Sequence, residues 1–206
     1  VYKRQEQRIE NGQVQRVSLP LSNHGSGYTV KSTLSKGFYE LGLKTSFLVL
    51  LNISKAEQIS GGQRLPYQYR LMRLEPKVIW TPNRHWETSY QTDIRYGGNK
   101  IGERTRLAPL WNVTQQVQLS YIFSPIEASL SVDHYHNDVN EDQSVNAVFA
   151  DFSVSWKSGR WQITTTATNL FDKRTYAYTQ YASLESYTSW VRIRPREFLV
   201  AIRYQL

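Results

Sequence analysis

Apolar side chains recur at every second residue in several segments of this 206-residue chain. This is the period of a β-strand with one apolar face, because successive strand side chains point to opposite faces of a sheet. The apolar stripes lie within residues 45–53, 86–96, 117–123, 128–132, 148–156 and 198–206. No segment of comparable length has a helical period. The sequence therefore predicts an all-β fold.

Turn signals separate these segments, and short connections alternate with long ones. Short turns are expected at Asn11-Gly12 and at residues 39–41, 82–84, 124–126 and 158–160, and Asn-Gly is a strong hairpin signal. Longer links are expected at residues 22–26, 60–65, 97–109, 137–145 and 178–187. This spacing predicts about eleven strands in an antiparallel up-and-down meander, with short turns at one end and long loops at the other. Outer-membrane β-barrels have this asymmetry.

The distribution of apolar and charged residues favours a membrane barrel over a membrane helix. The longest apolar runs have five residues, as at 47–51, whereas a membrane helix needs about 18. A barrel strand exposes only alternate residues to lipid, and a charge at the middle of its lipid face costs roughly 2–4 kcal/mol. The faces opposite the apolar stripes carry the charged residues Lys44, Arg73, Glu75, Lys77, Glu87, Asp93, Arg95, Asp133, Asp151, Lys157 and Arg203. We therefore expect lipid on one face of the sheet and water on the other.

Large aromatic residues gather beside the predicted short turns. They are Phe38, Trp80, Trp86, Phe123, Trp156, Trp161 and Tyr204. Amphipathic rings prefer the level of the lipid headgroups, so these residues are expected to form an aromatic girdle on the periplasmic side. The alternative is that they are ordinary core aromatics near turns.

Pro76 fits its predicted strand poorly, because proline has no N–H group for the hydrogen-bond ladder. The sequence leaves two explanations: a β-bulge at this residue, or a different register for the strand.

The C-terminal forty residues resemble the C-terminal signature of TonB-dependent receptors. The resemblance rests on Asn169-Leu170-Phe171-Asp172-Lys173, on Tyr176, and on the residues 194–197 (Arg-Pro-Arg-Glu) before a final apolar strand. Residues 35–38 (Ser-Lys-Gly-Phe) before a turn are similar to the receptors of Bacteroidota. The family implies a 22-stranded barrel, of which this chain would be the C-terminal half. The chain departs from the family in lacking a plug domain and a TonB-contacting segment, and in ending at Leu206 where many outer-membrane proteins end in Phe.

The resemblance also implies a function and a location. The complete protein would lie in the outer membrane of a Gram-negative bacterium and take up a scarce ligand, such as an iron chelate, cobalamin or a glycan. Its implied partners are outer-membrane lipid and lipopolysaccharide, the TonB complex through an upstream region, and a surface lipoprotein. Lys100, Arg104 and Arg106 lie in an expected ligand-facing loop. They could meet an anionic ligand or lipopolysaccharide phosphates, or be solvated loop charges.

Other features point to no catalysis, cofactor or metal. The net charge of +8 is spread along the chain without a basic run, so nucleic-acid binding is not expected. His134 and His136 share a strand face without a third metal ligand. The acidic residues Asp133, Asp138, Glu141 and Asp142 match no calcium-loop spacing. We find no catalytic constellation and predict that the protein is not an enzyme.

The first five residues, Val1 to Gln5, translate back to a DNA sequence that resembles a transposon end used in sequencing libraries. We hypothesise that residues 1–5 are such a scar and that the barrel domain spans residues 6–206. Three other functions stay open: a porin or adhesin barrel without TonB, a soluble all-β binding domain, and a membrane-attached enzyme with a barrel fold.

Overall fold

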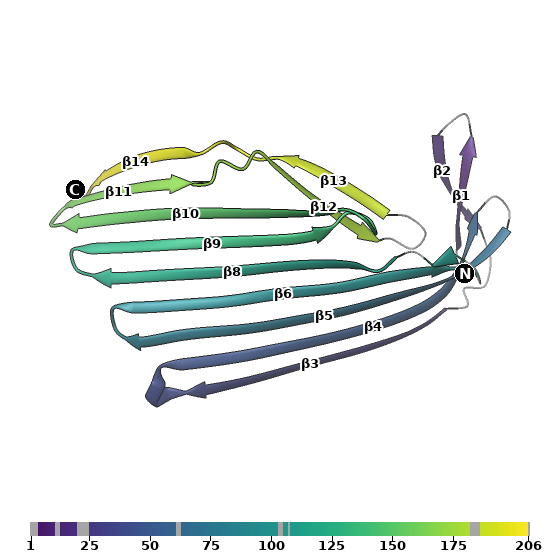
Figure 1. Cartoon of the computed structure of the whole chain (residues 1–206), viewed down its shortest axis with the longest axis horizontal. Helices are drawn as coiled ribbons and strands as arrows, with labels where there is room; N and C mark the ends of the chain where they lie inside the picture. Colours follow the sequence, from purple (N-terminus) through teal and green to yellow (C-terminus); the bar gives the residue numbers. More distant parts are fainter. Residues whose placement is uncertain are drawn as a thin grey trace.

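The computed structural model describes residues 4–10, 13–19, 25–60, 63–102, 105–106, 108–181 and 186–205. Nearly all of them are in antiparallel β-strands (Figure 1). The elements are β1 (Arg4–Glu10), β2 (Gln13–Leu19), β3 (Ser26–Phe38), the 3-10 turn η1 (Tyr39–Leu41), β4 (Leu43–Ser60), β5 (Gln63–Asn83), β6 (Trp86–Ile101), β7 (Thr105–Arg106), β8 (Leu110–Phe123), β9 (Ile126–Asp138), β10 (Ser144–Ser158), β11 (Trp161–Thr168), β12 (Thr175–Tyr181), β13 (Ser186–Arg192) and β14 (Glu197–Tyr204). The predicted all-β class is confirmed.

Twelve strands form one sheet, and β12 and β13 form a second sheet of two strands. Sequential neighbours from β3 to β11 pair antiparallel, apart from the short β7, and β14 pairs with β11 beyond the β12–β13 hairpin. The β1–β2 hairpin joins the sheet through two parallel pairs with β4. The sheet is open: in the described part of the chain β3 pairs only with β4, and β14 only with β11. The antiparallel meander is therefore as predicted, but the chain closes no barrel.

Four short turns lie at one end of the sheet, which also holds the C-terminus (Figure 1). They are η1, Arg84-His85, Ser124-Pro125 and Gly159-Arg160, in agreement with the sequence. The predicted turn at Asn11-Gly12 lies outside the described residues. Gly42 ends η1 with a φ of 62°, and a Cβ atom there would collide with the carbonyl oxygen of Thr81. Glycine is therefore required at this turn.

The long connections at the other end differ more from the sequence prediction. The expected loop at 60–65 is wrong, because β4 and β5 stay paired as far as Ser60 and Gln63. The expected loop at 97–109 is partly strand, since β6 continues to Ile101 and β7 follows. The expected loop at 178–187 contains the ends of β12 and β13. Apolar residues such as Ile59, Leu65 and Ile101 occur there singly, so no apolar stripe of period two reveals these strand ends.

All the predicted stripes lie on one face of the large sheet, which we call the apolar face. Directly paired residues share a face, and the register connects the stripes from edge to edge. One such row runs through Phe198, Ala167, Phe152, Leu130, Leu119, Thr88, Trp80, Leu43 and Phe38. We call the end of the sheet with the four short turns the turn end, and the opposite end the loop end. The row starts at the turn end of β3 and reaches the loop end of β14, so neighbouring strands are progressively staggered.

The apolar face is exposed. Phe198, Val200 and Ile202 expose 67%, 66% and 66% of their surface, and Phe152 exposes 42%. Among the described residues no second sheet packs against this face, as a β-sandwich would require. Buried residues are few, and several of them lie under the β12–β13 hairpin on the opposite, polar face.

Pro76 lies on the predicted face of β5, opposite Phe47 of β4. The β5–β6 ladder omits Glu75 and Pro76 and resumes in the same register, with Leu74 opposite Ile94 and Lys77 opposite Gln91. The missing N–H group of Pro76 thus leaves a gap in the ladder, but there is no β-bulge at this residue and no change of register. Neither of the two explanations that the sequence left open is therefore correct. The register shift between β5 and β6 lies between Trp80 and Asn83, beside the turn.

Candidate functional site

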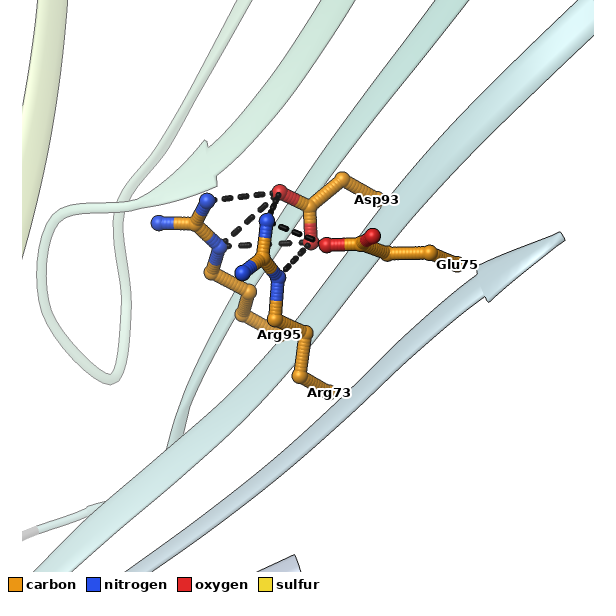
Figure 2. Close-up of polar contacts among 4 residues, drawn as sticks. All are labelled: Arg73, Glu75, Asp93 and Arg95. Atoms are coloured by element: carbon orange, nitrogen blue, oxygen red, sulfur yellow. Dashed lines mark hydrogen bonds and ion pairs between the residues drawn. The ribbon is translucent and has the colours of Figure 1, made fainter. Parts of the chain in front are cut away.

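Four charged side chains from β5 and β6 form an ionic cluster on the polar face (Figure 2). Arg73 and Arg95 are direct cross-strand partners, an arrangement of like charges that is destabilising by itself. Asp93 lies between them and accepts two hydrogen bonds of 3.0 Å from Arg73 Nε and Nη2. It also accepts one of 2.6 Å from Arg95 Nη2. Glu75 forms an ion pair with Arg73. The two carboxylates thus neutralise the two guanidinium groups.

The β12–β13 hairpin covers the polar face at the loop end. Asn137 of β9 donates from Nδ2 to the Tyr176 hydroxyl (3.0 Å) and to the Ala177 carbonyl oxygen (3.2 Å). Thr179 donates to the carbonyl oxygen of Val139 (3.2 Å). Ala177 and Thr179 are almost completely buried, at 0% and 1% exposure. Side-chain hydrogen bonds and burial therefore hold β12 against the large sheet.

An aromatic contact adds to this anchoring. The rings of Tyr135 and Phe149, from β9 and β10, lie 5.1 Å and 6.4 Å from the ring of Tyr176. All three pairs in this group meet edge to face, a geometry that aromatic rings prefer.

A cavity of about 370 Å³ separates the hairpin from the ionic cluster. Its lining combines charged, amide, hydroxyl and aromatic groups: Tyr69, Leu71, Arg73, Asp93, Arg95, Gly97, Leu110, Asn112, Thr114, Asn137, Tyr176, Tyr178 and Thr179. Asn112 Oδ1 is buried and accepts no hydrogen bond within the described residues. The cavity has the size of a small-ligand pocket, and it offers both donors and acceptors to a polar molecule. Its lining contains no cysteine and no histidine.

The signature residues 169–173 form the clamp that holds the base of the hairpin. Asn169 has a φ of 51° and is 6% exposed. Its Nδ2 donates to the carbonyl oxygens of Lys173 and Arg194, both at 2.8 Å, and its Oδ1 accepts from the Lys173 N–H at 2.9 Å. One side chain thus ties the chain entering β12 to the chain leaving β13. The clamp is fixed to β10 of the large sheet because the Asn169 N–H donates to Asp151 Oδ1 at 2.8 Å.

Asp172 completes the clamp at its exposed side. It accepts from Arg174 Nη2 at 2.8 Å and from the Arg196 N–H at 2.9 Å. The hydrogen bond from Arg174, and then that from the Arg196 backbone, lower the pKa of Asp172 below its usual value. Leu170 donates its N–H to the Ala150 carbonyl oxygen, whereas the Phe171 side chain is 57% exposed.

The seven aromatic residues predicted beside the short turns lie there, at the turn end of the apolar face. They are Phe38, Trp80, Trp86, Phe123, Trp156, Trp161 and Tyr204, and all are at least 37% exposed. Trp161 and Tyr204 are paired across β11 and β14 with their rings 4.8 Å apart. The apolar face also has aromatic residues at the loop end, where the rings of Tyr96 and Trp111 lie 4.6 Å apart. The sequence prediction missed this second group.

Of the three cations of the predicted ligand-facing loop, Lys100 and Arg106 lie on paired strands. Lys100 is a strand residue of β6, on the same side of the sheet as the apolar face, opposite Gln68 of β5. Arg106 of β7 is opposite Lys100 in the ladder, and Arg104 lies outside the described residues.

The histidines of β9 bond to neighbouring strands. His134 Nδ1 lies 3.3 Å from Gln115 Oε1, and His136 Nδ1 lies 2.8 Å from Asn146 Oδ1. Asp138 accepts from the Trp111 N–H at 2.8 Å. No group of three metal-ligating side chains occurs in the described ranges.

The sequence identified Arg73, Glu75, Asp93 and Arg95 only as charges of the polar face. Their mutual contact follows from the β5–β6 register, which the turn at Arg84-His85 sets. The sequence signal that could have revealed the cluster is that charges occupy alternate positions on two adjacent strands. The cavity could not be found in the sequence, because it depends on where the hairpin folds.

In the part of the chain that is described, no helix is long and apolar enough to cross a membrane. Comparisons with protein-family models, with curated proteins and with solved structures each found no match to this chain. The likeness of residues 169–173 to the TonB-dependent receptors therefore stays a prediction.

Proposed function

We propose that this chain is the C-terminal part of the barrel wall of a TonB-dependent outer-membrane receptor, which takes up a scarce ligand. In this proposal the apolar face meets lipid and the polar face lines the interior. The turn end is periplasmic and the loop end is extracellular. The complete barrel has 22 strands, and the open edges at β3 and β14 are paired with strands outside this chain.

The observation that carries the proposal is the exposure of a continuous apolar face opposite a charged one. On β5, the stretch of the apolar face from Trp80 to Met72 is uncharged and measures roughly 27 Å along the strand at about 3.4 Å per residue. The apolar band of an outer-membrane barrel has a similar height, about 25 Å. Exposure of so large an apolar area to water is rare in soluble proteins.

Two further observations support a barrel wall. Each strand is staggered against its neighbour in the same direction, as strand tilt in a barrel requires. Aromatic residues lie on the apolar face at both ends of the strands, where outer-membrane barrels have their aromatic girdles.

The polar face supports a role in ligand passage. The β12–β13 hairpin would be an extracellular loop folded toward the interior, with the cavity of about 370 Å³ at its base. The neutral ionic cluster would keep this part of the wall polar without a strong net field.

Spin labels on single cysteines test the lipid exposure. The chain has no native cysteine, so labels can be placed at four successive residues of β10, Phe152 to Ser155, in the intact protein in bilayers. Oxygen partitions into lipid, so it is expected to increase the spin relaxation rate of labels at Phe152 and Val154. Labels at Ser153 and Ser155 are expected to respond less to oxygen. Equal accessibility at all four positions would contradict the lipid-facing wall.

Energy dependence separates a TonB-dependent receptor from a passive barrel. Uptake of the ligand is expected to stop both when the gene is deleted and when TonB is removed. Uptake that persists without TonB would indicate a porin and refute this part of the proposal.

A further inference from the structure

Among the described residues, charges on the apolar face lie near the ends of the strands, and the loop end has a compact group of them. Lys55 of β4, Gln68 of β5 and Lys100 of β6 form one cross-strand row. Arg70 is two residues from Gln68 on β5, on the same face, opposite Ile53 and Gly98. We call Lys55, Arg70 and Lys100 the rim cluster. Three cations from three adjacent strands thus surround one amide side chain.

The rim cluster is accessible, and cations predominate around it among the described residues. Lys55, Arg70 and Lys100 are all exposed, and Arg70 Nη2 lies 3.5 Å from Gln68 Oε1. Lys55, Gln68 and Lys100 line a hollow of about 590 Å³ together with Glu57, the one carboxylate in its lining. Arg64, also exposed, lies further out on the same face of β5. Among the described residues, cations therefore outnumber carboxylates in this part of the rim.

The surface beside the rim cluster is apolar. The next row toward the middle of the sheet contains Val30, Leu51, Met72 and Tyr96 on neighbouring strands. A molecule that fits both surfaces has an anionic head and a hydrocarbon body. Lys55 and Lys100 flank β5, so their strands are roughly 10 Å apart at about 4.8 Å per strand. This spacing suits a headgroup with several anionic oxygens, because each phosphate offers three acceptors and up to two negative charges.

We propose that the rim cluster binds the phosphate groups of a membrane lipid, whose acyl chains lie along the apolar face beneath it. This inference rests on the proposed function, because it requires that the apolar face meets lipid. Charge-assisted hydrogen bonds from Lys and Arg supply the affinity for phosphate, and the apolar row supplies selectivity for a lipid over a free anion.

Native mass spectrometry of the intact protein in detergent tests the site by counting bound lipid. The probes are a bisphosphorylated lipid A and the same lipid with both phosphates removed. We expect the phosphorylated lipid to bind at least ten times more tightly, and the variant Lys55→Gln/Arg70→Gln/Lys100→Gln to lose about tenfold in affinity for it. The control variant Lys44→Gln/Lys77→Gln/Arg203→Gln removes three cations from the polar face and should bind as the unmodified protein does.

Three results would overturn the inference: equal binding of the two lipids, an unchanged affinity in the rim variant, or displacement of the lipid by millimolar inorganic phosphate. The last result would show a site for a free anion. Insertion into bilayers of neutral lipid checks the proposed function separately. A protein that inserts but has no phosphate preference refutes only this inference, whereas one that does not insert refutes the proposed function.

Discussion

The two faces of the large sheet are built from alternate residues of the same strands, yet they have different chemistry. On β9, Leu130 lies on the apolar face between Leu119 and Phe152, whereas the next residue, Ser131, lies on the polar face between Gln118 and Asp151. The polar face accommodates Arg73, Asp93 and Arg95 near the middle of the strands because the carboxylates lie beside the guanidinium groups. The apolar face has its charges near the ends of the strands. Strand propensity cannot explain this difference, because both faces are built on the same strands, whereas lipid on one side and water on the other, as proposed, would explain it.

The largest expected effect comes from moving a charge across the sheet. Leu130→Arg puts a cation in the middle of the apolar face and should lower the free energy of unfolding in bilayers by about 3 kcal/mol. Ser131→Arg, one residue away, should change it by less than about 0.5 kcal/mol, because Asp151 is its cross-strand neighbour and the polar face is wet. Urea titration of the protein in lipid vesicles measures both values. Similar losses in the two variants would mean that the faces do not meet different solvents.

The second effect concerns the clamp, which holds the hairpin over the polar face. Asn169→Ala removes three hydrogen bonds from a nearly buried side chain and should destabilise the hairpin by about 2 kcal/mol. Amide hydrogen exchange in β12 and β13 is expected to accelerate, while exchange in β9 and β10 stays slow.

Lys173→Ala is the matched control for the clamp, because Lys173 contributes only its backbone N–H and carbonyl groups to Asn169. Its exchange should equal that of the unmodified protein. Unchanged protection of the hairpin in Asn169→Ala would show that the packing of Tyr176, Ala177 and Thr179 is sufficient by itself.

A smaller effect is expected at the ionic cluster. Asp93→Ala leaves Arg73 and Arg95 directly opposite each other without their shared acceptor. The cost should be about 1 kcal/mol, since both guanidinium groups are partly exposed and water screens their repulsion. Adding Arg95→Ala to Asp93→Ala should restore most of this loss, whereas the neighbouring polar-face change Gln91→Ala should cost little. A double variant less stable than Asp93→Ala would argue against repulsion as the cause.

The difference between the two faces also determined how much the sequence could predict. Strands with an apolar stripe, such as those containing the segments 117–123 and 148–156, were found because one face of each strand is apolar and gives the sequence a period of two. The same pattern located the short turns and the aromatic residues beside them. Strand ends without an apolar stripe carry no such pattern, so the start of β5 at Gln63 and the extension of β6 to Ile101 were missed.

The candidate site was predictable in its residue types but not in its assembly. The alternation placed Arg73, Asp93 and Arg95 on the polar face, and the signature marked Asn169 and Asp172. The cavity and the rim cluster arise from register and from the folding back of the hairpin, and both involve contacts between residues distant in the sequence. A single sequence does not specify such contacts locally.

The smallest expected effect tests whether the exposed side of the clamp depends on charge. The pKa of Asp172 is lowered by the Arg174 hydrogen bond and by the Arg196 N–H, so its ionised form is favoured by folding. Its stabilisation is complete above the pKa of the unfolded chain and is lost as the pH falls through the lower pKa of the folded protein. Exchange of the Arg196 amide should therefore show extra acceleration only at acid pH, after correction for intrinsic rates. Asp172→Asn should abolish this pH dependence, because the amide carries no charge at any pH. If the unmodified protein and Asp172→Asn give the same pH profile, the clamp is held by Asn169 alone and its exposed side contributes geometry rather than charge.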